Sequence, residues 1–335
     1  MKYYTTSFEE IISLENLLLA YKEFKVGKSK KKDVMEFEFS LMSNLIDLHN
    51  DLKNKSYKHS LYTHFKINDP KPRDIHKALV RDRVFHHAIY RKLYPFFDKA
   101  FISDSFSCRI NKGTHKALDR FEKFSRCESK NYTKQCFVLK CDIQKFFASI
   151  DHRRLIEILN KRIIDKDISS LLENIIKSFN TKDKINKGLP LGNLTSQLLV
   201  NVYMSEFDQF AKHILKVKYY IRYADDFVFI NKDKNYLEDV KIKIDLFLKE
   251  KLKLNLHPDK VFIKSIYSGV DFLGWIHFPK YKVLRTATKK RMFRKLKENN
   301  FKNESVQSYL GLLRYGNTFK IKNKIYYNKN FSDDI

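Results

Sequence analysis

Apolar residues recur at helical spacing along much of the chain. Phe8, Ile11, Ile12, Leu18 and Leu19 follow a loosely helical pattern, which predicts an amphipathic helix over residues 7–24. This stripe is ordinary for a helix that faces a core, so we expect residues 1–55 to pack on the chain; binding of a partner is the open alternative. The same spacing predicts helices over residues 33–52, 76–98, 152–162, 167–179, 194–215 and 235–252, and a helical tail from residue 286.

Shorter apolar runs predict strands between these helices. Residues 136–143 form a continuous apolar run and predict a buried strand. Aromatic and β-branched runs at residues 219–221 and 227–230 flank a short polar centre and predict a β-hairpin. Further strands are predicted within residues 57–75, near residues 261–266 and over residues 270–278, and a loop is predicted over residues 188–193.

The predicted hairpin carries two adjacent carboxylates, Asp225 and Asp226, at its turn. Adjacent carboxylates repel each other, and both stay ionised at low cost only when a cation lies beside them. The pair is therefore a candidate Mg²⁺ site. Asp is also common in turns because it bonds its own backbone, so this pattern alone fits an ordinary turn equally well.

The composition indicates a folded, strongly basic protein. Of its 335 residues 43% are hydrophobic and 14% aromatic, and no internal repeat is present, so we expect one integrated, multi-lobed unit. Lys and Arg number 66 against 39 Asp and Glu, a formal net charge of +27, which favours a polyanionic partner such as nucleic acid. A lysine-rich solvated surface encoded by an AT-biased genome would give the same charge without any such partner. A membrane surface is the weaker alternative as the partner.

Other sequence features concern the compartment. No run reaches the roughly 18 to 20 apolar residues of a membrane span, and Glu9, Glu10 and Glu15 interrupt any signal-peptide core. The four cysteines form no CxxC pair, so we expect reduced thiols rather than a zinc site. The chain is expected to be cytoplasmic, in a prokaryote or a phage.

A third carboxylate, Asp142, closes the apolar strand 136–143. A carboxylate there is costly unless it is paired, binds a metal or caps the helix that follows. Together with Asp225 and Asp226 it supplies what a two-metal phosphoryl-transfer site needs. In such a site one ion lowers the pKa of an attacking hydroxyl and the other stabilises the leaving phosphate. Mg²⁺ suits this chemistry because it takes one or two carboxylates plus substrate oxygens.

These residues lie in motifs that resemble the reverse transcriptase family. Residues 141–147 and 222–227 resemble its first palm motif and its catalytic hairpin. The other resembling blocks follow in family order over residues 55–315, at 71–73, 81–84, 101–107, 112–115, 256–260, 270–275 and, in the thumb, 306–317.

The resemblance implies an α+β fold, a right-hand polymerase with fingers, palm and a short helical thumb. The palm would be a ferredoxin-like antiparallel sheet with helices on one face. The expected domains are an N-terminal helical extension at 1–55, fingers at 56–135 with part of 153–190, a palm at 136–280 and a thumb at 281–335.

The resemblance also implies a catalytic and metal site. Asp142, Asp225 and Asp226 would be catalytic, and together with Ile143 they would hold two Mg²⁺ ions, for which Mn²⁺ could substitute. Lys260 lies where the family uses a general acid for pyrophosphate, although a solvated lysine fits the sequence equally well.

The incoming dNTP is expected to contact a second group of residues. Lys71 and Arg73 would clamp its triphosphate, unless they belong to an ordinary basic loop. Ile143 and Phe147 would lie at the nucleotide, and the bulky Phe147 ring would clash with a ribose 2′-OH. The alternative for Phe147 is a place in the core, for which Phe146 is the stronger candidate.

Residues 188–197 separate subgroups of the family. Group II intron and retron enzymes mostly carry Gln-Gly and then Ser-Pro, whereas this chain has Leu191-Gly192 and Ser196-Gln197, which resembles the reverse transcriptases of diversity-generating retroelements. Leu191, Gly192 and Gln197 would lie near the nascent base pair. An apolar side chain discriminates poorly between partners, so Leu191 is compatible with low fidelity. The resemblance implies errors directed to template adenines.

The subgroup also implies partners: template RNA, the cDNA/RNA hybrid, dNTPs and a small basic accessory protein, with no membrane. No maturase-like or endonuclease domain is seen before Ile335, so targeting is expected to come from the RNA and that accessory protein. Two alternatives stay open. One is a defence-type or intron-related reverse transcriptase of ordinary fidelity, and the other is a non-catalytic RNA-binding scaffold.

Overall fold

The computed structural model describes residues 2–69, 71–181 and 184–330, and the chain packs as two compact units. The first unit comprises residues 1–103, 143–216 and 244–258, and the second comprises residues 104–142, 217–243 and 259–335. The helix α11 (Lys234–Leu252) contributes to both units. The expected division into four domains stays a prediction.

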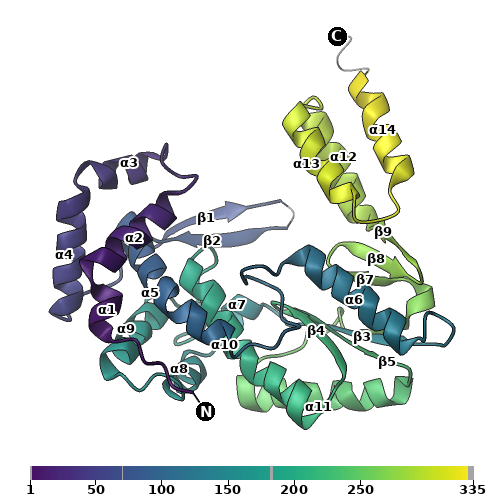
Figure 1. Ribbon diagram of the computed structural model, residues 1–335, viewed down its shortest axis with the longest axis horizontal. Coiled ribbons are helices and arrows are strands. Elements are labelled where there is room, and N and C mark those ends of the chain that lie inside the picture. The colour runs from purple at the N-terminus through teal and green to yellow at the C-terminus, as the bar shows by residue number, and fades with distance from the viewer. Residues whose placement is uncertain (1, 70, 182–183, 331–335) are drawn as a thin grey trace. The chain divides into compact units, whose positions relative to one another are not determined.

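The first unit is mainly helical and carries one two-stranded antiparallel hairpin, β1–β2 (Figure 1). Its elements are α1 (Phe8–Ile12), α2 (Leu14–Lys25), α3 (Lys32–Phe39), α4 (Leu41–Lys53), β1 (Thr63–Ile67), β2 (Arg73–Lys77), α5 (Val80–Asp98), α7 (Phe146–Ser149), α8 (His152–Asn160), α9 (Lys166–Lys177), α10 (Leu194–Gln209) and the π-helix η1 (Phe210–Ile214).

The second unit contains two antiparallel sheets, in the orders β4-β5-β3-β6 and β7-β8-β9, together with four helices besides its part of α11 (Figure 1). Its elements are α6 (Thr114–Glu128), β3 (Phe137–Asp142), β4 (Tyr219–Tyr223), β5 (Asp226–Asn231), β6 (Phe262–Ser265), the 3₁₀ turn η2 (Ile266–Ser268), β7 (Val270–Phe272), β8 (Trp275–Phe278), β9 (Tyr281–Leu284), α12 (Thr286–Glu298), α13 (Asn303–Leu313) and α14 (Phe319–Asn330).

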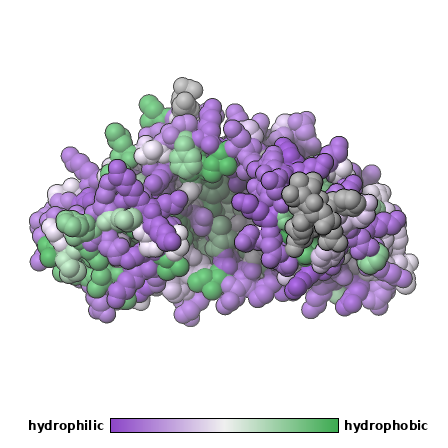
Figure 2. All heavy atoms as spheres, turned by 90° about the horizontal axis from the view of Figure 1, so that it is seen from above, coloured by the Kyte–Doolittle hydropathy of each residue, from purple (hydrophilic) through white to green (hydrophobic). Residues whose placement is uncertain are grey.

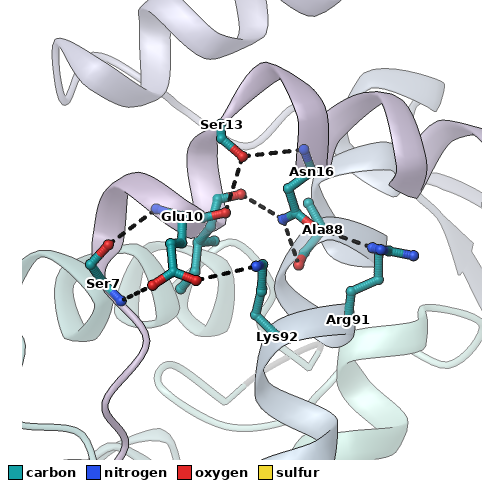
Figure 3. Close-up of polar contacts among 8 residues, drawn as sticks. Ser7, Glu10, Ser13, Asn16, Ala88, Arg91 and Lys92 are labelled. Carbon is teal, nitrogen blue, oxygen red and sulfur yellow. Dashed lines mark hydrogen bonds and ion pairs between the residues drawn. The ribbon is translucent and has the colours of Figure 1, made fainter.

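The N-terminal helices pack on α5, as the apolar stripe predicts. The single helix expected over residues 7–24 is instead two helices, because Ser13 has extended backbone and its hydroxyl caps α2 at the Asn16 amide, 3.2 Å away. Asn16 is buried, and its Nδ2 donates to the carbonyls of Ile11 at 2.8 Å and Ala88 at 3.2 Å, which ties α2 to α5 (Figure 3). Buried carbonyls are thereby satisfied at the junction.

Other helix boundaries differ from the predictions for local reasons. The predicted helix 33–52 is broken at Ser40, which ends α3 and begins α4. The helix predicted from residue 76 begins at Val80, because residues 73–77 pair with β1 as a strand. The predicted helix 194–215 is α-helical only to Gln209 and continues as a π-helix, where the rings of Phe210 and Phe247 stack at 4.1 Å.

The predicted hairpin and the predicted buried strand are confirmed. β4 pairs with β5, and β5 pairs with β3 in a continuous antiparallel register. Side chains alternate between the two faces of a sheet. Along β3, Val138 on one face and Leu139 and Cys141 on the other are fully buried, so the central strands are covered on both sides. Whether the sheet is ferredoxin-like stays a prediction.

One core connects most of the second unit. It includes Phe121 of α6, Val138 and Val228 of the larger sheet, Trp275 of the smaller sheet and Leu296 of α12. The sequence did not predict α6 or β9. The apolar residues of α6 have helical spacing with charged residues on the opposite face, so the signal of an amphipathic helix was present and was overlooked.

The surface seen in one view is mostly polar, and the cysteines are not joined to one another. Hydrophilic residues cover most of the face seen in Figure 2. All four cysteines are free thiols, with Cys136 and Cys141 buried and Cys108 and Cys127 exposed. Within the described ranges, no helix combines the length and apolar character needed to cross a bilayer.

Candidate active site

Two of the three predicted catalytic carboxylates lie opposite each other in the larger sheet. Asp142 ends β3, Asp226 begins β5, and the two residues are direct partners in the antiparallel register. Residues in direct register have side chains on the same face and only about 5 Å between Cβ atoms. Strand pairing therefore brings together two carboxylates that are far apart in the sequence.

Lysines contact both carboxylates. The Lys140 Nζ lies 3.4 Å from Asp226 Oδ2, and the Lys260 Nζ lies 2.9 Å from Asp142 Oδ1. Lys140 faces the same side of the sheet as Asp142 because it precedes it by two residues. Its side chain is 9% exposed, so this ion pair is shielded from solvent, whereas the Lys260 side chain is 40% exposed.

Burial raises the pKa of Asp226 to about 7, with Lys140 acting to lower it and Asp142 and Asp225 acting to raise it. The Oδ1 atom of Asp226 is buried and has no hydrogen-bond partner among the described residues. A buried carboxylate oxygen without a partner is unfavourable, and a cation ligand would satisfy it.

The opposed pair fits a divalent cation. Mg²⁺ needs only one or two carboxylates when substrate oxygens complete its coordination, and Asp142 and Asp226 supply two. Within the described part of the chain, no three His, Cys, Asp or Glu side chains are arranged to hold a metal. The contribution of Asp225 and Ile143 to a metal site is thus a prediction.

The turn that carries Asp225 has a defined backbone. Tyr223 pairs with Asp226, so Ala224 and Asp225 form a two-residue connection, and Ala224 has φ +57°, in the left-handed region. A two-residue hairpin loop requires such a conformation, and it is strained by about 1 kcal/mol for a residue with a Cβ. The turn is therefore maintained by contacts around it.

Arg222 supplies those contacts from β4. Its side chain is fully buried, and its two terminal nitrogens donate to the Ala224 carbonyl at 3.2 Å and to the Ser105 hydroxyl at 3.0 Å. Its backbone bonds to the segment at Asp104 and Phe106, each at 3.0 Å. One side chain thus joins the carboxylate turn to a neighbouring segment of the second unit.

The first unit contains a cavity of about 300 Å³. Gly192 and Gln197, two of the residues expected at the nascent base pair, line it together with Asn193 and Leu194. Gly192 has φ +109°, and a Cβ there would lie 3.2 Å from the Ile75 side chain, so this position favours glycine. The Leu191 carbonyl accepts a bond from the His76 amide at 3.1 Å, which joins this segment to β2.

The remaining predicted residues of the first unit lie on different elements. Phe146 is buried in the core, as expected, whereas Phe147 is half-buried on α7 with its ring edge-on to Phe146 at 5.7 Å. Ile143 is buried. Lys71 and Arg73 are exposed at the start of β2, so nothing in their surroundings distinguishes a triphosphate clamp from a basic surface.

The sequence analysis missed several residues of these sites. Arg222 lies within the quoted motif 222–227. Lys140 lies in the predicted strand 136–143, one residue before the motif 141–147, and period-two alternation places it on the same face as Asp142. A charged residue inside an apolar strand was the available signal. The cavity residues Phe24 and Lys28 gave no comparable signal, because they lie on a helix and in a turn outside the quoted blocks, whereas Arg83 lies in the quoted block 81–84.

Comparison with known families gives the same assignment as the motifs. The profile described as reverse transcriptase (RNA-dependent DNA polymerase) matches residues 67–277, more than half of the chain. The chain belongs to the reverse transcriptase family. The match includes Asp142, Asp225 and Asp226, the residues 191–197 and Lys260.

Relatives of this reverse transcriptase-family chain include intron-encoded proteins. It is 25% identical to a putative COX1/OXI3 intron 2 protein of Saccharomyces cerevisiae over 85% of the chain and 39% of that protein. It is 27% identical to protein YkfC of Escherichia coli over 58% of the chain and 60% of that protein. It is 24% identical to the group II intron-encoded protein LtrA of Lactococcus lactis over 68% of the chain and 47% of that protein. The chain thus spans about two fifths to three fifths of these relatives.

Proposed function

We propose that the protein is an RNA-directed DNA polymerase that makes cDNA by two-metal phosphoryl transfer. The observation that carries this proposal is the opposed pair Asp142 and Asp226, with a buried, partnerless oxygen on Asp226, in a member of the reverse transcriptase family. A non-catalytic scaffold has no need for two half-buried carboxylates that repel each other.

In the proposed mechanism Asp142, Asp225 and Asp226, together with Ile143, would hold Mg²⁺, or Mn²⁺ in its place. The bound ions supply a lowered pKa at the primer 3′-hydroxyl and charge stabilisation at the leaving pyrophosphate. Lys140 offsets part of the carboxylate charge from its position 3.4 Å from Asp226. Lys260 donates a proton to the leaving pyrophosphate.

We further propose that the predicted nucleotide-binding residues select the incoming dNTP. Lys71 and Arg73 hold its triphosphate, and Phe147 excludes a ribose 2′-OH. Leu191, Gly192 and Gln197 contact the nascent base pair. The cavity beside Gly192 and Gln197 supports a ligand-binding role for that segment.

The central test is cDNA synthesis by the purified chain on a primed RNA template with dNTPs and Mg²⁺. Asp225→Asn should abolish synthesis, because a neutral amide binds Mg²⁺ weakly, while RNA affinity is retained or improved. Asp239→Asn, which changes an exposed carboxylate on α11, is the matched control and should leave synthesis unchanged. Full activity of Asp225→Asn would contradict the two-metal assignment.

The subfamily proposal is a diversity-generating retroelement enzyme that miscopies template adenines. It is supported by Leu191-Gly192 and Ser196-Gln197. With template RNA and a small basic accessory protein, the cDNA should carry errors concentrated opposite adenines. Sequencing of the cDNA measures this, and faithful copying of adenines would refute the subfamily while leaving the polymerase activity intact.

The second candidate is an intron-related reverse transcriptase of ordinary fidelity. It is supported by the intron-encoded relatives in yeast and Lactococcus. The two candidates differ in their genomic surroundings: a diversity-generating retroelement requires a template repeat and a variable repeat near the gene. Flanking DNA without such a pair would favour the intron-related enzyme.

A further inference from the structure

The cavity of the first unit is built largely by residues outside the recognised motifs. Phe24 of α2 and Lys28, three residues beyond that helix, form part of its wall. Phe65 of β1, Lys77 of β2 and Arg83 of α5 form other parts, beside Gly192 and Gln197. Figure 1 shows α2, α5 and the β1–β2 hairpin beside one another. The N-terminal helices therefore complete a concave site and do more than cover a core.

The charge of this wall is positive. Asp33 pairs with both Lys77, at 2.7 Å, and Arg83, at 2.5 Å. Lys28 makes no ion pair with a carboxylate anywhere in the described ranges; its Nζ donates to the Phe24 carbonyl at 2.7 Å. The cavity wall thus carries three positive charges, on Lys28, Lys77 and Arg83. One carboxylate, that of Asp33, lies next to two of them. Such an excess of positive charge attracts an anion into the cavity.

Three lining residues have a buried polar atom with no hydrogen-bond partner among the described residues. These atoms are Arg83 Nε, His86 Nδ1 and Asn193 Oδ1. Buried polar atoms in native proteins are normally satisfied, so three unsatisfied atoms on residues that line one cavity are unusual. Arg83 Nε is a donor and the His86 nitrogen donates in one tautomer, whereas Asn193 Oδ1 is an acceptor, so an acceptor-rich occupant could satisfy only the first two.

The cavity also offers apolar surface. The ring of Phe24 has the Lys28 ammonium and the Arg83 guanidinium near it, each 4.9 Å from the ring centre. Phe65 and Ile75 add apolar wall. Cations over an aromatic ring are held in place without losing their attraction for an anion. A volume of about 300 Å³ admits a phosphate together with the sugar or base attached to it.

We propose that this cavity binds a phosphate ester, with Lys28, Lys77 and Arg83 as the cations that hold the phosphate. The group comes either from a single-stranded nucleic acid or from a free nucleotide, and both sources rest on the proposed function of the chain. Guanidinium and ammonium groups bind phosphate oxygens through charge-assisted hydrogen bonds. Residues 1–55 thereby contribute directly to ligand binding.

The first experiment measures binding to the full chain without divalent metal. Fluorescence anisotropy with a labelled single-stranded RNA of ten nucleotides tests one source, and calorimetry with dATP tests the other. Lys28→Gln should weaken the binding of one of these ligands about tenfold. If that ligand is the RNA, the slope of log Kd against log salt concentration should also fall by about 0.7. Lys30→Gln removes an exposed charge from the same loop and should change neither affinity more than about twofold.

The outcomes separate the sources. Weakened RNA binding assigns the cavity to a nucleic-acid strand, and weakened dATP binding assigns it to a free nucleotide. If neither affinity changes, the proposal is wrong. Lys28→Arg, which keeps the charge, should restore whichever affinity is lost.

A second measurement needs no variant. Lys28 of the unaltered chain should become protected from acetylation when the ligand is added, as mass spectrometry reads, while Lys30 stays reactive. Equal reactivity of Lys28 with and without both ligands would overturn the inference. Synthesis of cDNA on a primed template is measured in parallel, so failure here is distinct from failure of the proposed polymerase activity.

Discussion

At the scale of single residues, Arg222 links the carboxylate turn to its surroundings. It is fully buried and bonds the carbonyl of Ala224, the strained residue beside Asp225. Arg222→Lys keeps the charge but loses the planar fork that reaches two acceptors. We expect kcat for cDNA synthesis to fall about tenfold with little change in KM for dNTP, because positioning of the turn is impaired while the proposed nucleotide contacts stay.

The comparison for Arg222 is Ser105→Ala. It removes only the second acceptor, 3.0 Å from the guanidinium, and should cost about 1 kcal/mol of stability with a smaller effect on kcat. Steady-state kinetics and thermal melting measure both variants. A purely structural role would lower the melting temperature of Arg222→Lys and leave kcat of the folded protein unchanged.

Phe147 and Phe146 make a matched pair for testing sugar selection. Phe147 is half-buried and Phe146 fully packed, although the two rings are adjacent in the chain and in contact. Phe147→Ala should raise ribonucleotide incorporation by about tenfold or more, because the clash with the 2′-OH is removed. Competition between labelled NTP and dNTP measures this ratio.

The control Phe146→Leu should lower the free energy of unfolding by about 1–3 kcal/mol through lost packing and leave sugar selection unchanged. If both variants incorporated ribonucleotides equally, Phe147 would have no specific role.

At the scale of elements, the smaller sheet contains a buried histidine. His277 on β8 packs its ring 4.5 Å from Phe121 of α6, and burial, followed by the Lys282 charge, lowers its pKa from 6.5 to about 3. The folded state thus favours neutral His277, and stability is lost as pH falls from about 6.5 towards 3, where only the unfolded chain takes up the proton. The loss from this residue is at most ~5 kcal/mol.

Denaturant titrations at several pH values measure this effect. His277→Phe should flatten the fall in unfolding free energy below pH 6.5. It should not abolish the fall, because burial also lowers the pKa of His87, to about 4. Stability contributed by His87 is therefore also lost as the pH falls. The exposed His213→Gln is the control and should leave the pH dependence as it is. If the unfolding free energy of His277→Phe fell with pH as steeply as that of the unaltered chain, the effect could not be assigned to His277.

The elements themselves could largely be predicted from the sequence, whereas their boundaries could not. Short apolar runs predicted the hairpin and the buried strand, and helical spacing predicted most helices. The breaks at Ser13 and Ser40 depend on backbone conformation and caps that apolar spacing does not report. The strand at residues 73–77 depends on pairing with β1, which a local pattern cannot reveal.

At the scale of the whole molecule, the net charge of +27 predicts strongly salt-dependent binding of nucleic acid. With about four phosphate contacts, affinity for single-stranded RNA should fall by tens of fold between 50 mM and 200 mM salt, since each contact adds about 0.7 to the slope. Binding titrations over this range measure the slope. A flat dependence would show that the charge is an ordinary solvated surface.

The candidate site was predictable to different degrees in the two units. Asp142, Asp225 and Asp226 lie in recognisable motifs, and the strand register places Asp142 opposite Asp226. The position of Lys140 on the same face as Asp142 follows from period-two alternation along β3. The cavity could not be predicted, because Phe24, Lys28 and Arg83 come together only through the packing of α2 on α5 and the adjoining hairpin.

The register of β3 against β5 limits how the gene can change length at this point. Six consecutive pairs end at Asp142 opposite Asp226. A three-nucleotide insertion within β3 would add one residue and turn Asp142 to the opposite face of the sheet. Six inserted nucleotides would restore the face, and a single extra residue could be accommodated only as a bulge. A substitution leaves this register unchanged, whereas single-codon insertions and deletions would separate the two carboxylates.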